Sequence, residues 1–301
     1  MDRRLLQLFI DAANAWLQDR APTMGAALSY YTAFSIAPLL LIALSVAGLV
    51  FGDDAVRGEV FAQLRDLMGS EGAGAIESLL QSAQQPMESM LGTAVGLVAL
   101  LVGATTVFAE LQDSLDAIWR VPPREGTGWW LWLRARVVSF GMILAVGFLL
   151  MVSLIISAVL EALQTWWSPF FGDWALVLQA VNLIVGFVVT MAVFGMIYKW
   201  IPRARIAWRD VWIGAGVTAL LFGIGRYLIG LYIGRSGVTS SFGAAGSLVV
   251  VLLWVYFSAQ IFLYGAEFTR LYAARHGYHR GDAAQGDQDA ALSNSNQPRL
   301  P

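Results

Sequence analysis

The stretch SLVVVLLWVYFSAQIFLYGAEFTR, residues 247–270, decides the fold of this chain. It is long and apolar enough to cross a bilayer as an α-helix, which takes about 20 residues. It also carries Tyr256, Gln260 and Glu267, at steps of four and seven that place the three side chains on one face of a helix. A membrane-spanning helix turns such a polar stripe away from lipid, toward other helices or water.

The composition indicates an integral membrane protein. Of the 301 residues, 57% are hydrophobic and only 13% are charged, whereas a soluble domain has roughly 25% charged residues. The 12 tryptophans suit anchoring at the two membrane interfaces. The absence of cysteine excludes disulfides, thiolate metal sites and cysteine nucleophiles. The net charge of −2 says little about partners.

We expect an all-α polytopic membrane protein with six transmembrane helices in a single domain, residues 1–280. Residues 2–19 lack the apolar core and cleavage site of a signal peptide. Their apolar side chains fall on one helical face, which predicts an amphipathic helix lying in the membrane interface. The apolar runs predict spans at about 24–51, 90–110, 130–163, 174–200, 211–233 and 246–270.

The segment 52–88, between the first two spans, is polar and acidic, with apolar residues at helical spacing. This pattern predicts two short periplasmic amphipathic helices, separated by a break at Gly72 and Gly74. After the second span, residues 111–119 are expected to continue as an amphipathic helix that stops before the prolines at 122–123.

The distribution of arginine and lysine predicts the orientation. One set of connecting segments holds nearly all the basic residues, and the other set holds only Arg57, Arg65 and Arg235. Because basic residues gather on the cytoplasmic side, both termini are expected in the cytoplasm. Residues 281–301 carry no apolar pattern, so they are expected to form a disordered cytoplasmic tail.

Polar groups and one proline in the spans are candidates for a substrate path. At roughly 1.5 Å of rise per residue, most of them share a cytoplasmic level and could line one cavity. Arg226 and Asn182 lie together at an outer level, and Pro38 is expected to kink the first span. The candidates are Tyr30, Tyr31, Pro38, Glu110, Asn182, Lys199, Arg226, Tyr256, Gln260 and Glu267.

Each candidate also has a purely structural interpretation. A salt bridge to Arg270, three positions on, would account for Glu267. Glu110 would fit the headgroup zone, and Arg226 would reach the outer headgroups by snorkelling. The tyrosines would be packing residues with satisfied hydroxyls. Gln260 would join two helices by a hydrogen bond worth about 0.6 kcal/mol, and at mid-depth its amide must face protein or water in any case.

Three blocks carry a resemblance to a known family. They are AALSYYTAFSIAPL at 26–39, YKWIP at 198–202, and GAAGS at 243–247 leading into LWVYFSAQIFLYGAE at 253–267. In order and spacing, over about residues 5–275, the chain resembles the YihY/BrkB family of bacterial inner-membrane proteins, historically labelled ribonuclease BN. The resemblance implies six spans and a multi-pass inner-membrane location. Its members carry labels from ribonuclease to serum resistance to transporter, so it leaves the function open.

The residues argue against a nuclease. Metal-dependent nucleases need clustered histidine and carboxylate ligands, and the only histidines are His276 and His279. No predicted cytoplasmic segment is long enough for a catalytic domain, and no basic face with interleaved aromatic residues suggests RNA binding. We therefore expect no enzymatic activity, no metal or other cofactor, and no nucleic-acid partner.

The polar stripe and the Pro38 break favour a transporter or exporter of a small solute. If the solute is an organic anion, Arg226 and Lys199 are the expected contacts. Three spans followed by three permit inverted repeats, although the halves show no convincing match. The alternative is a non-transporting scaffold that holds lipids or partners for envelope assembly. A lipid-modifying enzyme is a weaker third hypothesis, since no nucleophile–base set can be named. Membrane lipids are the expected partners, and the oligomeric state stays open.

Overall fold

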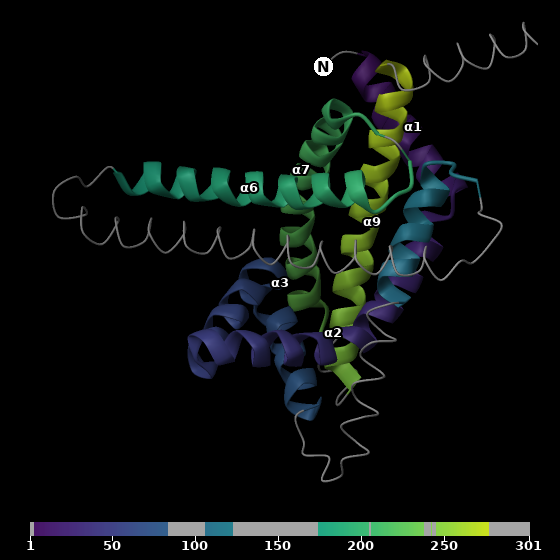
Figure 1. Ribbon diagram of the computed structural model, residues 1–301. Helices are drawn as coiled ribbons and strands as arrows, with labels where there is room; N and C mark the ends of the chain where they lie inside the picture. The colour runs from purple at the N-terminus through teal and green to yellow at the C-terminus, as the bar shows by residue number, and fades with distance from the viewer. Residues whose placement is uncertain are drawn as a thin grey trace, which may run out of the picture.

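The computed structural model describes residues 3–83, 106–122, 174–204, 206–237, 242 and 245–276. Across these residues every regular element is a helix and there is no strand, as the sequence predicts. A helix over residues 106–118 ends just before Trp119, close to its predicted end. The labelled helices in Figure 1 are α1 (Arg3–Gln18), α2 (Ala21–Phe51), α3 (Asp53–Ala83), α6 (Trp174–Trp200), α7 (Trp208–Ser236) and α9 (Gly246–His276).

Three of the described helices are long and apolar enough to span a membrane. They are α7, α9 and the part of α6 from Ala180 to Trp200. They coincide with the predicted fourth, fifth and sixth spans, and α2 covers the predicted first span at 24–51. The predicted third span at 130–163, most of the second at 90–110 and the tail at 281–301 lie outside the described residues.

The turn between α1 and α2 is tight. Arg20 adopts a positive φ of 57°, and its carbonyl accepts hydrogen bonds from the backbone N–H groups of Thr23 and Met24. Pro22 falls in the first turn of α2, where its missing N–H has no intrahelical partner to lose. The helix then continues through Pro38 to Phe51. The two-residue turn joins α1 to α2, and both helices pack against α9.

The helix α3 breaks at Gly69, which takes φ 77° and ψ 174°. The sequence prediction of two helical segments is therefore met, but the predicted break at Gly72 and Gly74 was wrong. Both of these glycines lie in helical backbone, and the Gly74 carbonyl accepts a hydrogen bond from Ser78 Oγ at 2.9 Å. A positive φ is available to any glycine at little steric cost, so composition alone leaves the position of the break open.

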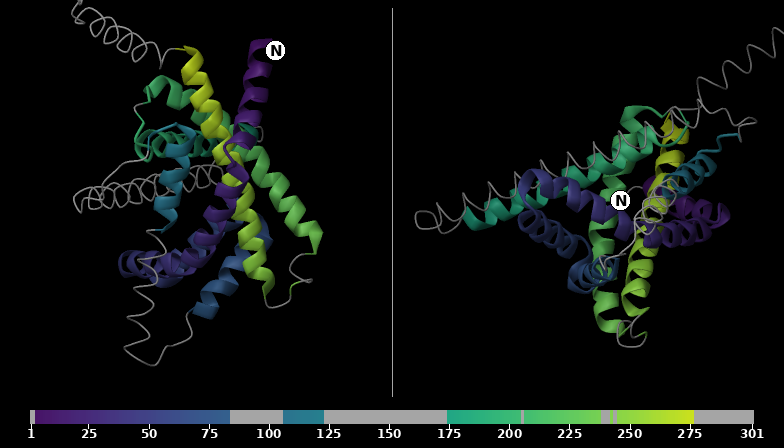
Figure 2. Two further views of the ribbon diagram at one scale, coloured as in Figure 1. Left: turned by 90° about the vertical axis from the view of Figure 1, so that its right-hand side faces the viewer. Right: turned by 60° about the horizontal axis from the view of Figure 1, so that its bottom comes forward.

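The helix α9 forms the centre of the described structure, packing against α1, α2, α3 and α7 (Figures 1 and 2). It approaches α7 closely at two places where one helix carries a glycine. Thr269 of α9 lies against Gly214, and Thr218 of α7 lies against Gly265, each where a Cβ atom would collide. Small residues permit such close helix contact in membranes, and here they fix α7 against the stripe-bearing helix.

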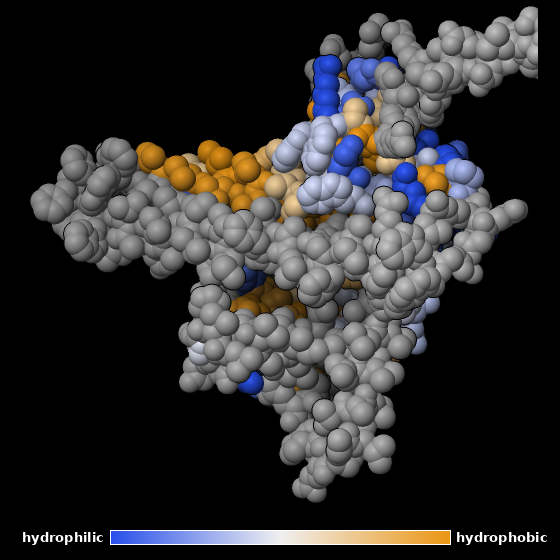
Figure 3. Space-filling view, in the orientation of Figure 1, coloured by the Kyte–Doolittle hydropathy of each residue, from blue (hydrophilic) through white to orange (hydrophobic). Residues whose placement is uncertain are grey.

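The helix α6 packs on α7 with its C-terminal part, while its N-terminal part extends away from the other described helices (Figures 1 and 2). This extension is apolar on the face shown in Figure 3. Exposed large apolar side chains suit contact with lipid in a membrane protein, whereas a soluble protein rarely gathers them. The exposed side chains on this helix include Val177, Leu183, Ile184, Phe187 and Val188.

Candidate functional site

Gln260 lies at the contact between α9 and α2. Its side-chain amide sits directly against Gly25, so closely that a Cβ atom on Gly25 would collide with Nε2. Both Nε2 and Oε1 are shielded from solvent, and neither has a hydrogen-bond partner among the described residues. The predicted hydrogen bond from Gln260 to a neighbouring helix is therefore not found among the described residues.

Glu267 lies seven residues further along α9 and its side chain is 0% exposed. Its Oε2 accepts two hydrogen bonds from Arg270, from Nε at 3.0 Å and from Nη2 at 2.7 Å. The predicted salt bridge to Arg270 is thus present, but it occupies only one carboxyl oxygen. The other oxygen, Oε1, is buried without a hydrogen-bond donor among the described residues.

Asp19 brings a second buried carboxyl group to this place. It lies in the turn between α1 and α2, and its side chain is 8% exposed. The outer oxygen Oδ1 accepts a bond of 2.8 Å from Arg120 Nη2, whereas Oδ2 is buried without a donor among the described residues. Each of these two carboxyl groups is therefore bound by one guanidinium group, Asp19 by Arg120 and Glu267 by Arg270.

A hydroxyl cluster lies one turn before Glu267. Tyr198 Oη donates to the Phe262 carbonyl at 2.7 Å and lies 3.1 Å from Thr218 Oγ1, which bonds the Gly214 carbonyl at 2.8 Å. Tyr198 and Thr218 are both 0% exposed. Unlike the groups of Gln260 and Glu267, these hydroxyls are satisfied, so they join α6, α7 and α9 as a structural unit.

Lys199 lies in the last turn of α6. Its Nζ donates to the Ile206 carbonyl and lies 5.4 Å from the centroid of the Trp208 ring. Cations near a helix C-terminus are favourable because they complement the free carbonyl groups there. The described contacts of Lys199 thus stabilise the connection between the C-terminal end of α6 and the N-terminal end of α7.

The tyrosine candidates lie apart from the Gln260 contact. Tyr30 is 56% exposed on α2 and packs with Tyr31 and Phe34, at ring-centroid distances of 5.7 and 4.9 Å. Tyr256 is half-buried beside Phe257, with ring centroids 5.5 Å apart. Pro38 lies within α2. The described contacts do not gather these residues around Gln260, so a shared cytoplasm-facing cavity stays a prediction.

The remaining candidates occupy three different helices. Arg226 is half-buried on α7, Asn182 is exposed on α6, and Glu110 is half-buried on the helix over residues 106–118. Arg226 and Asn182 both have interaction partners. An outer polar site built from this pair likewise stays a prediction.

Two ionic contacts of the structure were not predicted from the sequence. Asp19 looks like any charged residue between two helices, and only tertiary packing, including that of α1 and α2 on α9, buries its side chain. Asp116 follows Leu115 on the buried side of its helix. Its carboxylate accepts bonds from the backbone N–H and from Nε of Arg203, at 2.8 and 2.7 Å, which anchors the segment after α6. The sequence did offer one indication that Asp116 is buried, because it lies among apolar neighbours on an amphipathic helix.

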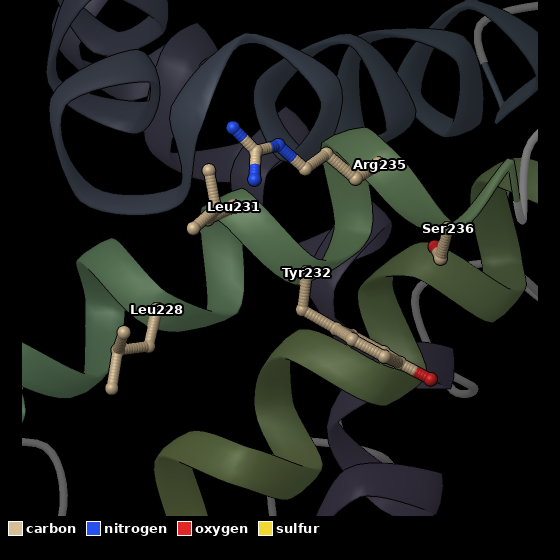
Figure 4. A pocket seen from close by; sticks show the side chains of 5 residues that line it. All are labelled: Leu228, Leu231, Tyr232, Arg235 and Ser236. Atoms are coloured by element: carbon tan, nitrogen blue, oxygen red, sulfur yellow. The ribbon is translucent and has the colours of Figure 1, made fainter.

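A shallow cavity of about 350 Å³ opens near the C-terminal end of α7. Figure 4 shows its five lining side chains, with the Tyr232 ring lying over α9. This ring packs edge-on against Phe257, with centroids 6.0 Å apart. No group of three or more histidine or acidic side chains that could hold a metal ion occurs within the described ranges. The lining residues are Leu228, Leu231, Tyr232, Arg235 and Ser236.

Known proteins resemble this chain over most of its length. It is 29% identical over 264 residues to UPF0761 membrane proteins of Pseudomonas paraeruginosa and Pseudomonas aeruginosa, covering 84% of this chain and 60% of each relative. It is 28% identical over 280 residues to a UPF0761 membrane protein of Ralstonia nicotianae, covering 90% of this chain and 60% of that protein. The chain thus spans about 60% of the length of these relatives. No solved structure matches it.

The family relationship agrees with the apolar helices and with the three sequence blocks. A family model described as virulence factor BrkB matches residues 12–290, which include every polar group of α9 discussed above. The protein is accordingly a membrane protein, and it belongs to the BrkB family.

Proposed function

We propose that this membrane protein transports a small polar solute. The observation that carries the proposal is a set of buried polar atoms on α9, a helix long and apolar enough to span a membrane, that have no hydrogen-bond partner among the described residues. They include the Gln260 amide and Glu267 Oε1, beside Trp254 Nε1 and Ser258 Oγ. A buried polar group without a partner costs about 1–3 kcal/mol. Such groups are retained where they serve a ligand or an ion path, which is the usual role of polar residues within membrane spans.

The proposal places the protein in the bacterial inner membrane with both termini in the cytoplasm. The positive-inside distribution of arginine supports this orientation. With it, Asp19, Arg120, Lys199 and Glu267 lie at the cytoplasmic end of the helices, and Gln260 lies deeper by about 10 Å at 1.5 Å per residue. A solute entering from the cytoplasm would meet the charged groups first and the amide second. An anionic solute would find Arg120 at the entrance, 61% exposed.

Transport is tested with purified protein in proteoliposomes. The vesicles are loaded with a ¹³C-labelled extract of small bacterial metabolites, and mass spectrometry follows which compounds leave. We expect wild-type protein to release a restricted set of polar compounds that protein-free vesicles retain. The Gln260→Leu variant should release them at least 10-fold more slowly, because leucine has a similar volume but no polar atoms.

The same substitution separates function from stability. Leucine removes two buried polar atoms that have no hydrogen-bond partner among the described residues. Gln260→Leu should therefore unfold at the same temperature as wild type or higher. As a matched control, Tyr227→Phe removes a hydroxyl on α7 from a side chain that is 71% exposed. It should leave both flux and stability unchanged. Equal flux from wild type and Gln260→Leu would overturn the assignment of Gln260, and no flux of any compound would overturn transport itself.

The second candidate is a non-transporting scaffold. It is favoured by the tight contact of Gly25 with Gln260, which leaves no space for a solute between α2 and α9 at that point. A scaffold requires this contact to stay closed, whereas a transporter requires it to open. Cysteines introduced at Gly25 and Ala259, in a chain that has no cysteine of its own, would distinguish the two. The reduced double variant is the reference for flux, because a side chain at position 25 itself displaces the Gln260 amide. Crosslinking that abolishes flux supports transport.

A further inference from the structure

The cavity at the C-terminal end of α7 combines apolar side chains with one cation. Its lining residues, at positions 228, 231, 232, 235 and 236, follow one another at helical steps, so they form one stripe on one face of α7. Ile229 and Ile233, on another face of the same turns, are buried in a core shared with α3 and α9. The cavity therefore lies on a different side of α7 from the one that packs in this core.

The aromatic residues of α7 indicate how deep this cavity lies in the membrane. Trp208 and Trp212 are exposed near the start of the helix, and Tyr232 is exposed near its end. Tryptophan and tyrosine gather at the two membrane–water interfaces. Trp212 and Tyr232 are 20 positions apart, about 30 Å at 1.5 Å per residue, which matches the thickness of the hydrocarbon core. Arg235, three positions beyond Tyr232, therefore falls in the headgroup layer, where lipid phosphates lie.

The Arg235 side chain extends over the apolar part of the cavity. In Figure 4 it runs back along the helix over Leu231, away from Ser236 and the end of α7. Side chains of a helix ordinarily lean in this direction, toward the N-terminus. The guanidinium group thus lies between the headgroup layer and the leucines of the cavity, where a phosphate and an acyl chain of the same lipid would meet.

An apolar track leads from the guanidinium group into the membrane. Leu231, Leu228 and Ile224 precede Arg235 by four, seven and eleven positions, which keeps all four side chains on one helical face. The three apolar side chains are 39%, 56% and 53% exposed, respectively. From Ile224 to Arg235 the helix rises about 16 Å at 1.5 Å per residue, which is close to half of the roughly 30 Å hydrocarbon core. The track is therefore about as long as one leaflet is thick.

We propose that this face of α7 binds one molecule of an anionic glycerophospholipid, in the leaflet at the C-terminal end of the helix. This is the periplasmic leaflet in the proposed orientation. Arg235 binds the phosphate, because a guanidinium group offers it paired, charge-assisted hydrogen bonds, and the apolar track contacts an acyl chain. Lipid binding at this face is independent of solute transport.

The lining residues favour an anionic headgroup over a zwitterionic one. Of the described residues that line the cavity, none is acidic, so an ammonium group in the headgroup would find no carboxylate there. Ser236 Oγ donates to the Ile233 carbonyl at 3.0 Å. The Tyr232 ring lies over α9, and its hydroxyl points away from Arg235 (Figure 4). Arg235 is therefore the residue that recognises the phosphate, and phosphatidylglycerol is the preferred lipid.

The site is tested with the full chain in phosphatidylcholine vesicles that contain a trace of phosphatidylglycerol with a photoreactive diazirine in its acyl chain. After irradiation, peptide mass spectrometry locates the label. We expect labelling of residues 224–231 in wild type, and at least 5-fold less in Arg235→Gln. Arg57→Gln, which removes an exposed arginine of α3, should be labelled like wild type. The matching phosphatidylcholine probe should label residues 224–231 at least 5-fold less than the phosphatidylglycerol probe.

Two results of this experiment overturn the site. Equal labelling by both probes, or unchanged labelling of Arg235→Gln, would mean that α7 contacts bulk lipid without selecting a headgroup. Displacement of the phosphatidylglycerol probe by millimolar glycerol 3-phosphate or inorganic phosphate would identify a soluble phosphate compound as the occupant and would exclude a lipid.

A cation in the last turn of a helix also complements the helix dipole, which would give Arg235 a purely structural role. Thermal unfolding in detergent separates the two roles. Phosphatidylglycerol should raise the melting temperature of wild type and Arg57→Gln but not of Arg235→Gln, and without the lipid all three should melt alike. A melting temperature of Arg235→Gln that is lowered equally with and without the lipid would overturn the site. Arg235→Lys, which keeps the charge but not the paired geometry, should retain part of the labelling.

Discussion

The amide of Gln260 on α9 lies directly over the Cα atom of Gly25 on α2, with no space between them for a methyl group. The two residues are 235 positions apart in the chain, yet each determines what the other can be. A larger residue at 25 would displace the amide, and a smaller residue at 260 would leave a gap between the helices. The distance between α2 and α9 is set by this pair.

Gly25→Ala should weaken the packing of α2 on α9. The new Cβ atom would lie 3.1 Å from Cδ of Gln260 and closer still to Nε2. Overpacking of this kind costs about 1–3 kcal/mol of unfolding free energy. The measurement is unfolding by SDS in mixed micelles, followed by tryptophan fluorescence. The double variant Gly25→Ala with Gln260→Ala should recover most of the loss, because the clash is removed.

The matched control for this substitution is Gly223→Ala. Gly223 lies within α7, and nothing approaches its Cβ position within 4 Å. Alanine is preferred over glycine inside a helix by roughly 0.5–1 kcal/mol, so this variant should be as stable as wild type or more so. A loss of stability at Gly223 equal to that at Gly25 would mean that the clash with Gln260 is not the cause.

Tyr198→Phe should destabilise the junction of α6, α7 and α9. The phenylalanine keeps the ring contact with Phe262, whose centroid is 5.2 Å from that of Tyr198. It removes the hydroxyl that bonds the Phe262 carbonyl and Thr218. A buried hydrogen bond contributes about 1 kcal/mol, and we expect a loss of that size in the same SDS titration. Tyr227→Phe, on an exposed side chain, should show none.

Asp116→Ala should loosen the segment that follows α6. Its carboxylate holds both the backbone N–H and the Nε of Arg203. Hydrogen bonds to a charged group are worth about 1.5–3 kcal/mol, and the 34% exposure of Arg203 places the effect toward the lower value. Hydrogen exchange of residues 201–204 should accelerate. Asp11→Ala, which removes an exposed pair with Arg275, should cost less than about 1 kcal/mol.

Gly69→Ala should destabilise α3, whereas Gly74→Ala should not. Gly69 holds φ 77° and ψ 174°, a backbone region essentially restricted to glycine, which costs an alanine on the order of 1–3 kcal/mol. Gly74 lies in helical backbone with open space at its Cβ position. Comparison of the two variants in the SDS titration isolates the backbone effect, since both glycines lack neighbours within 4 Å. Equal stability of the two would contradict the positive φ at Gly69.

The sequence predicted the helices of the described ranges well because long apolar runs admit few alternatives. It singled out Gln260 and Glu267 because polar side chains in such a run are costly unless they face protein or water. It could not find Asp19, whose side chain is buried by tertiary packing around the α1–α2 turn. It also could not choose among Gly69, Gly72 and Gly74 for the break in α3, since each glycine tolerates the required φ. The sequence pattern identifies polar residues that are costly to bury. Which residues they contact depends on the tertiary structure.

The central place of α9 has a consequence for biogenesis. The ribosome synthesises α1, α2, α3 and α7 before residues 246–276, and each of these helices packs against α9. During synthesis, Gly25 of α2 must therefore wait without Gln260, its contact on α9. Assembly of the bundle is completed after translation has passed α9, which makes the nascent chain dependent on the insertion machinery or a chaperone until that helix arrives.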